Sequence, residues 1–76
     1  MQGIKQYYRV DKNKIGFLRF IIEAYDNLAI MTTLNAREGL VVMNISPSCE
    51  GTINALMLSL GHDFYVEPLP DFVHTT

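Results

Sequence analysis

The sequence predicts an α+β sandwich in which one antiparallel sheet carries two helices on one face. Apolar residues alternate with polar ones in four short segments and recur at helical spacing in two longer ones. These segments follow the order strand, helix, strand, strand, helix, strand. Right-handed crossovers in that order bring both helices to the same face of a four-stranded sheet, which predicts a ferredoxin-like βαββαβ sandwich.

The first half of the chain supplies one strand and one helix. Residues 4–10, IKQYYRV, alternate in polarity and are rich in aromatic and branched side chains, which is typical of a half-buried strand. From Lys14 to Asp26 the apolar residues change to helical spacing, so a helix is predicted there. Asp26 and Asn27 are expected to end it, because asparagine tolerates the left-handed conformation that closes many helices.

The second half supplies a hairpin, a helix and a short strand. Residues 28–34 and 39–46 are predicted to be strands rich in β-branched residues, joined by the polar segment NAREG. Residues 46–61, SPSCEGTINALMLSLG, predict a helix with proline at its start and glycine past its end. FYVE, residues 64–67, is predicted to be the last strand, ending before Pro68.

Chain length and composition indicate a single domain. We expect residues 1–76 to form one unit, with a core from about residue 4 to residue 67 and a flexible tail over residues 69–76. A chain of 76 residues buries only about 60–65% of the surface that its unfolded form exposes. Since 49% of the residues are hydrophobic, some apolar surface is expected to be shared with a second copy. The predicted assembly is a homo-oligomer, first of all a dimer.

Charge and targeting signals limit the classes of partner. The sequence has no secretory segment and no apolar run near the ~20 residues that cross a bilayer, so we expect a cytoplasmic location and no membrane partner. The net charge of −2 gives no general attraction to nucleic acids. RNA-recognition domains share this strand order, but the third strand, LVVMNI, lacks their aromatic and basic residues. Nucleic-acid binding is therefore the less favoured alternative.

One face of the predicted sheet is left open by the helices. Alternation along the strands predicts the side chains on this open face: Tyr7, Arg9, Met31, Thr33, Leu40, Val42 and Tyr65. Most of them are apolar or aromatic. The open face is therefore expected to be the dimerisation or binding surface.

The segment DKNKIGF opens the first predicted helix with a glycine and two lysines. Free amide groups at a helix N-terminus bind carboxylates or phosphates. We therefore hypothesise a ligand site formed by Lys12, Asn13, Lys14, Ile15 and Gly16. The alternative is an ordinary tight turn in which Gly16 relieves crowding and the lysines are solvated.

No motif predicts catalysis, a metal or a cofactor. Cys49 begins the apolar stripe of the second helix and is predicted to be a core residue, with a reactive thiolate near the helix N-terminus as the alternative. His62 and His74 have neither a catalytic companion nor metal-ligand spacing and are expected on the surface. We predict that the protein is not an enzyme and needs no cofactor.

The same turn carries a family resemblance. NKIGFL, followed by NLAI at the far end of the helix, resembles the ACT domain, a small ligand-sensing module of amino-acid metabolism whose pattern is Asp-x-Pro-Gly-x-Leu and then Gly-Ile-Asn-Ile. Gly16 and Leu18 match this pattern, whereas Asn13 stands at the aspartate position and Ile15 at the proline. The resemblance implies an effector bound near this turn at a subunit interface.

A longer stretch, RVDKNKIGFLRFIIEAYDNLAIMTTLNAREGLV, resembles a family of short, uncharacterised bacterial proteins, domain of unknown function 4911. This resemblance implies a family without implying an activity. Two hypotheses follow. The domain is a sensor of an amino acid or another small carboxylate, or it is a ligand-free module that binds itself or another protein.

Overall fold

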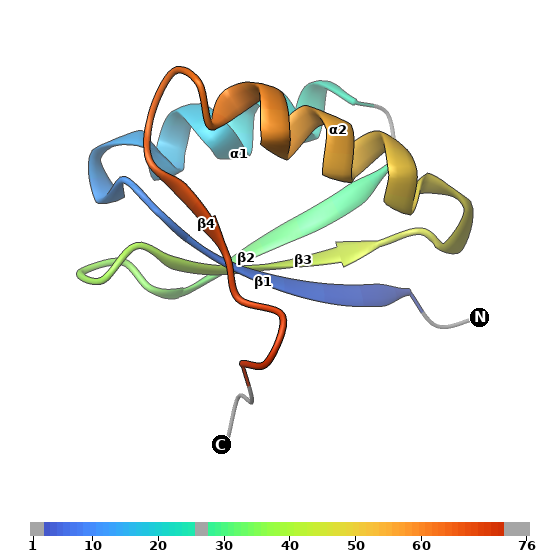
Figure 1. Ribbon diagram of the computed structural model, residues 1–76, viewed down its shortest axis with the longest axis horizontal. Coiled ribbons are helices and arrows are strands. Elements are labelled where there is room, and N and C mark those ends of the chain that lie inside the picture. The colour runs from blue at the N-terminus through green and yellow to red at the C-terminus, as the bar shows by residue number, and fades with distance from the viewer. Residues whose placement is uncertain (1–2, 26–27, 73–76) are drawn as a thin grey trace.

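A computed structural model of the chain describes residues 3–25 and 28–72. In these residues the strands and helices follow the predicted order, and a short 3-10 turn precedes each helix (Figure 1). The elements are β1 (Ile4–Val10), η1 (Lys12–Lys14), α1 (Ile15–Ala24), β2 (Ala29–Asn35), β3 (Leu40–Ile45), η2 (Pro47–Cys49), α2 (Glu50–Leu60) and β4 (Val66–Pro68).

The strands form one antiparallel sheet in the order β2-β3-β1-β4, and both helices lie on the same face of it (Figure 1). This order confirms the predicted ferredoxin-like fold. It also places β2 and β4 at the two edges of the sheet. Neither described helix is long and apolar enough to cross a membrane.

The core lies between the sheet and the helix layer. Helical spacing turns Leu18 and Ile22 of α1 toward the sheet, and Ile53 and Met57 of α2 do the same. The residues of the core cluster are Tyr8, Val10, Leu18, Ile22, Met31, Val41, Met43, Ile45, Ile53, Met57 and Leu60. They come from both helices and the three longer strands, so the core holds the two layers together.

Helix α1 begins at Ile15, one residue later than predicted, and α2 begins at Glu50, four residues later than predicted, because a 3-10 turn precedes each helix. In η1 the Asp11 side chain accepts a hydrogen bond from the Asn13 amide at 2.9 Å, and the Lys14 amide donates to the Asp11 carbonyl oxygen at 2.8 Å. At its other end α1 stops at Ala24. The predicted end at residues 26–27 lies outside the described residues.

The last strand is displaced from its predicted position, since β4 occupies Val66–Pro68 instead of residues 64–67. A proline within a strand is tolerated at a sheet edge, where no neighbour needs its missing amide hydrogen. Pro68 lies opposite Tyr8 of β1, and the next amide along, that of Leu69, donates to the Tyr7 carbonyl oxygen at 2.8 Å. The sheet bonding therefore continues past the proline.

The prediction that Met31 and Thr33 lie on the open face is wrong. The register pairs each of them with a core residue of β3, which puts both on the helix-covered face. Arg19 of α1 donates hydrogen bonds to the Met31 carbonyl oxygen at 3.1 Å and to the Thr33 hydroxyl at 3.0 Å. Ile30, Thr32 and, beyond the irregularity at residues 33–35, Asn35 are the exposed residues that β2 contributes to the open face.

Candidate functional site

A cleft lies beside the first half of β1, where the neighbouring strand is missing. Strand β4 pairs only with Tyr8–Val10, so it leaves the earlier residues of β1 uncovered. After β4 the chain turns, with the Phe72 amide donating to the Leu69 carbonyl oxygen at 3.2 Å. The Phe72 ring then packs against Tyr7, with 4.9 Å between ring centroids. The short β4 and this turn together leave a hollow at the sheet edge.

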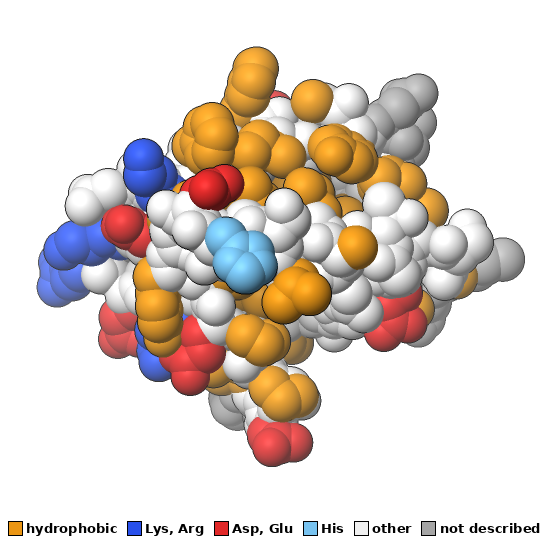
Figure 2. Space-filling view, turned by 45° about the horizontal axis from the view of Figure 1, so that its top comes forward, with side chains coloured by type: hydrophobic (Ala, Val, Ile, Leu, Met, Phe, Trp, Pro, Cys, Tyr) orange, Lys and Arg blue, Asp and Glu red, His pale blue; other side chains and the backbone are white. Residues whose placement is uncertain are grey.

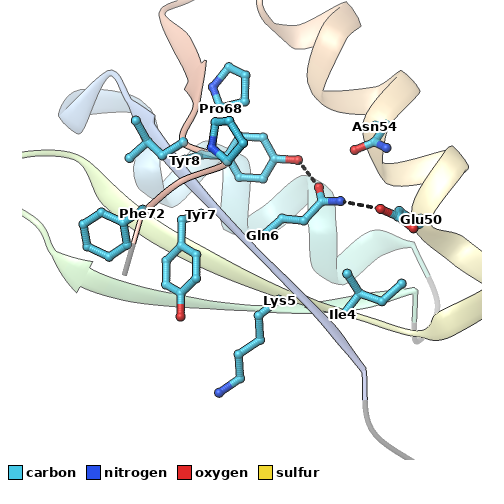
Figure 3. A pocket seen from close by; sticks show the side chains of 11 residues that line it. Ile4, Lys5, Gln6, Tyr7, Tyr8, Glu50, Asn54, Pro68 and Phe72 are labelled. Atoms are coloured by element: carbon cyan, nitrogen blue, oxygen red, sulfur yellow. Dashed lines mark hydrogen bonds between the residues drawn. The ribbon is translucent and has the colours of Figure 1, made fainter. Parts of the chain in front are cut away.

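The cleft has a volume of about 460 Å³. Figure 3 shows it between β1, the first turns of α2 and the segment that follows β4. Its lining residues are Ile4, Lys5, Gln6, Tyr7, Tyr8, Glu50, Asn54, Pro68, Leu69, Pro70 and Phe72. The cleft therefore combines apolar walls with a polar side formed by β1 and α2.

A chain of hydrogen bonds forms that polar side (Figure 3). The Tyr8 hydroxyl donates to Gln6 Oε1 at 2.6 Å, and Gln6 Nε2 donates to Glu50 Oε2 at 2.9 Å. Burial raises the pKa of Tyr8 above its usual value, and the nearby Glu50 carboxylate raises it further. The neutral Tyr8 hydroxyl holds the Gln6 amide in place, and the Gln6 amide in turn holds the Glu50 carboxylate. The position of this carboxylate therefore depends on a residue of the core.

A second hollow of about 340 Å³ continues along α2 on the same side of the molecule. It shares Tyr8, Asn54 and Pro68 with the first cleft. Its remaining lining residues are Met57, Leu58, Gly61, His62 and Val66. This second hollow is lined by fewer polar side chains than the first, and Gln6 and Glu50 line the first hollow and not the second.

The turn hypothesised as a ligand site lies elsewhere. Lys12, Asn13, Lys14 and Gly16 are exposed, Ile15 is half-buried, and all five lie outside both hollows. No atom lies within 4 Å of the position that a Gly16 side chain would take, so this glycine is not explained by a close approach. Ligand binding at the turn stays a prediction.

The remaining residues assigned to the open sheet face include several charged or hydrogen-bonded groups. Arg9 forms an ion pair with Glu38 at 3.6 Å, and the Tyr65 hydroxyl donates to Glu67. This hydrogen bond raises the pKa of Tyr65. The other predicted residues there are Tyr7, Leu40 and Val42, of which Leu40 is buried and the other two are half-buried. The open face is therefore less apolar than its sequence suggests.

Large apolar side chains are instead exposed on the helix layer, which the sequence analysis did not identify as a surface. Phe17, Phe20 and Tyr25 at α1 and Leu58 on α2 are all exposed. Figure 2 shows hydrophobic side chains gathered over this layer. The signal in the sequence is the number of apolar residues in the first helix, IGFLRFIIEA, which is more than one face of a helix can hold.

The cysteine and histidine predictions can be compared with the structure at two positions. Cys49 packs against the core cluster, as predicted, and His62 is exposed. His74 lies outside the described residues. Within the described residues, no group of three or more histidine, cysteine or acidic side chains is placed to hold a metal ion.

The strand order and helix layer define the class of protein, an α+β sandwich of the ferredoxin-like type. The chain belongs to the family described as "Domain of unknown function (DUF4911)", whose model matches residues 8–63. No curated protein and no solved structure has significant similarity to it. The family match covers β1 from Tyr8 onward through α2, so it includes Glu50 and Asn54 of the cleft.

Proposed function

We propose that this domain is a protein-interaction module that associates with a second copy of itself through the outer surface of its helix layer. The observation that carries the proposal is the exposure of Phe17, Phe20 and Tyr25 on a surface with little charge. Contiguous exposed apolar side chains on a small domain are typical of an interaction site.

The charges of the helices point mostly away from this surface. Helices α1 and α2 contain three charged residues, Arg19, Glu23 and Glu50. Arg19 is hydrogen-bonded to β2, and Glu50 lies in the cleft beside β1. Only Glu23 remains as an exposed charge on these two helices. Lys14 also lies beside this surface, with Nζ 6.0 Å from the centroid of the Phe17 ring, so a dimer must leave Lys14 and Glu23 solvated at the rim of the contact.

The exposed area and shape also favour a second copy. An aromatic side chain buries about 150–250 Å² when it is covered, and a stable interface needs roughly 800 Å² from each partner. The three aromatic side chains at α1 supply a substantial part of that area. A shallow hollow of about 540 Å³, lined by Tyr25 and small residues of α2 such as Gly51 and Ala55, offers a place for a partner's ring. In a two-fold dimer each copy supplies both the ring and the hollow.

The test is to measure the oligomeric mass in solution of two variants, each of which changes a side chain of nearly equal exposure. Phe20 is 71% exposed on the helix layer and Ile30 is 70% exposed on the open sheet face. We expect the wild type and Ile30→Glu to be dimers in sedimentation equilibrium, and Phe20→Glu to be a monomer, because a charge would then be buried at the interface.

Two outcomes would contradict the proposal. If Ile30→Glu were the monomer and Phe20→Glu the dimer, the contact would lie on the sheet face, as the sequence alone suggested. If the wild type were a monomer at every concentration measured, self-association would be refuted. Circular dichroism of both variants checks that neither substitution at these exposed positions unfolds the domain.

Sensing of an amino acid or another small carboxylate at the Lys12–Gly16 turn is a second candidate. It is supported by α1 beginning without a side-chain hydrogen bond from its cap, Lys14, since helix N-termini are sites where carboxylates bind. In a thermal-shift screen a real ligand raises the melting temperature with concentration, by an amount corresponding to about 2.7 kcal/mol at a hundredfold excess over Kd. The shift must disappear in a Lys12→Ala, Lys14→Ala double variant. An unchanged shift would place the ligand elsewhere.

A further inference from the structure

We propose that the cleft beside β1 binds an extended peptide segment carrying a basic side chain, which adds as a short strand to the uncovered edge of β1. This site is independent of the proposed self-association, because the cleft lies at the sheet edge and not on the outer surface of α1. Addition of a strand to a free sheet edge is an established mode of peptide recognition.

The backbone of β1 provides the first argument. The Tyr7 carbonyl oxygen accepts from Leu69, and the Asp11 amide donates to the Tyr65 carbonyl oxygen at 3.0 Å. Backbone groups alternate in direction along a strand, so the amide and carbonyl groups of Lys5 point to the same edge. Within residues 3–25 and 28–72 no backbone group pairs with Lys5 there. One residue of an antiparallel peptide can supply both missing partners.

The shape of the cleft provides the second argument. Its volume of about 460 Å³ falls in the range of about 300–1,000 Å³ that binding pockets occupy. Pro68, Pro70 and Phe72 form an apolar wall of the cleft, and two of these three residues lack an amide hydrogen. Figure 3 shows Pro68 and Phe72 away from Glu50 and Asn54. This wall therefore offers apolar contacts to a bound peptide and only few backbone donors that compete with β1.

Charge selects the type of peptide. A peptide residue opposite Gln6 would turn its side chain to the helix-covered side, where Glu50 lies. Among the residues that the structure describes, Glu50 and Lys5 are the only charged ones that line the cleft, and the Lys5 side chain points away from Glu50 (Figure 3). Gln6 donates to the Oε2 atom of Glu50, and no hydrogen bond within the described residues is made to Oε1. An arginine or lysine side chain fits this acceptor, and a charge-assisted hydrogen bond is stronger than a neutral one.

The experiment uses the blocked pentapeptide acetyl-Thr-Arg-Thr-Arg-Thr-amide and measures its Kd by NMR titration of the labelled domain. With the central threonine opposite Lys5, the flanking arginines face the helix-covered side. We expect saturable binding with the largest shifts at Lys5, Gln6 and Asn54. Glu50→Gln should weaken binding about tenfold, because it removes a charged acceptor while keeping an oxygen for Gln6. Asp63→Asn, an equal charge change at the other end of α2, should leave Kd unchanged.

Two altered peptides complete the test. Methylating the amide nitrogen of the central threonine should abolish binding, because that amide pairs with the Lys5 carbonyl oxygen. Replacing both arginines by glutamates should also abolish it. The proposal is overturned if the first peptide does not bind at millimolar concentration, if the methylated or acidic peptide binds equally well, or if Glu50→Gln has no effect. It is also overturned if this edge proves to be occupied by a second copy of the chain. The titration is repeated on the Phe20→Glu variant, which is expected to be a monomer. If this variant binds the peptide as the wild type does, peptide binding does not depend on the proposed self-association.

Discussion

Two glycines of this chain have opposite structural roles. Gly39 ends the hairpin turn directly before β3 with a φ of 73°, a left-handed conformation that favours glycine. A side chain there would collide with the Val10 carbonyl oxygen, and the Val10 amide donates to the Gly39 carbonyl oxygen at 2.8 Å. Gly16, by contrast, lies in α1 with open space around it.

Alanine substitution separates the two roles. Gly39→Ala is expected to lower the free energy of unfolding by about 1–3 kcal/mol, from strain and the forced separation of β1 and β3. Gly16→Ala is expected to raise it by about 0.5–1 kcal/mol, because alanine is the better helix former. Urea denaturation of both variants measures the effect. A destabilised Gly16→Ala would indicate a special backbone site at the turn and would favour the ligand hypothesis.

The pKa of the Tyr8 hydroxyl makes the stability of the domain depend on pH. Its pKa is raised by burial and by Glu50, so the folded protein holds the proton more tightly than the unfolded chain. The stabilising contribution is complete below the unfolded pKa of about 10 and is lost as the pH rises through the folded pKa. We expect the free energy of unfolding to fall above about pH 10, and to fall less in Tyr8→Phe. An equal loss in the two proteins would show that Tyr8 does not cause it.

At the scale of the elements, periodicity predicted every helix and strand but not the face that β2 presents. LAIMTTL has apolar residues on both sides, so alternation alone does not decide which side is buried. A slip of one residue exchanges the two faces. In the structure Met31 is buried in the core, and Arg19 bonds to the Thr33 hydroxyl on the same face across 14 residues of sequence. No local pattern signals such a contact.

The bounds of β4 were missed for a related reason. FYVE has the composition of a strand, and Pro68 resembles a stop signal, so the sequence favoured an ending before the proline. Only the edge position of β4, which is a property of the whole sheet, makes Pro68 acceptable inside the strand. Whether a strand ends before a proline or includes it can thus be decided only when the strand order in the sheet is known.

At the scale of the whole molecule, the cleft could not be predicted because its parts come from distant segments. Gln6 and Glu50 are 44 residues apart, and the apolar wall follows β4. The sequence instead drew attention to the turn at residues 12–16, where suggestive residues are adjacent in the chain. The fold was predictable from periodic patterns, whereas the cleft depends on where a three-residue strand ends.

The two proposed surfaces do not compete. The radius of gyration of 11.5 Å is about that of a compact chain of this length, so every surface lies close to the same core. The helix layer and the cleft beside β1 nevertheless use different side chains. A dimer formed through Phe20 would leave one peptide cleft free on each copy, so two peptides could be brought together by one dimer.

Strand β2 is the other edge of the sheet, and its exposed edge has a consequence for handling the protein. Residues 28–36, LAIMTTLNA, contain no charge, and Ile30 is 70% exposed. Uncharged edge strands of high β-propensity are where chains begin to form intermolecular fibrils. Arg37 and Glu38 follow this stretch in the hairpin loop. Arg19 covers it only at Met31 and Thr33. On prolonged storage or mild heating, insoluble aggregates of this protein are therefore expected to grow from β2.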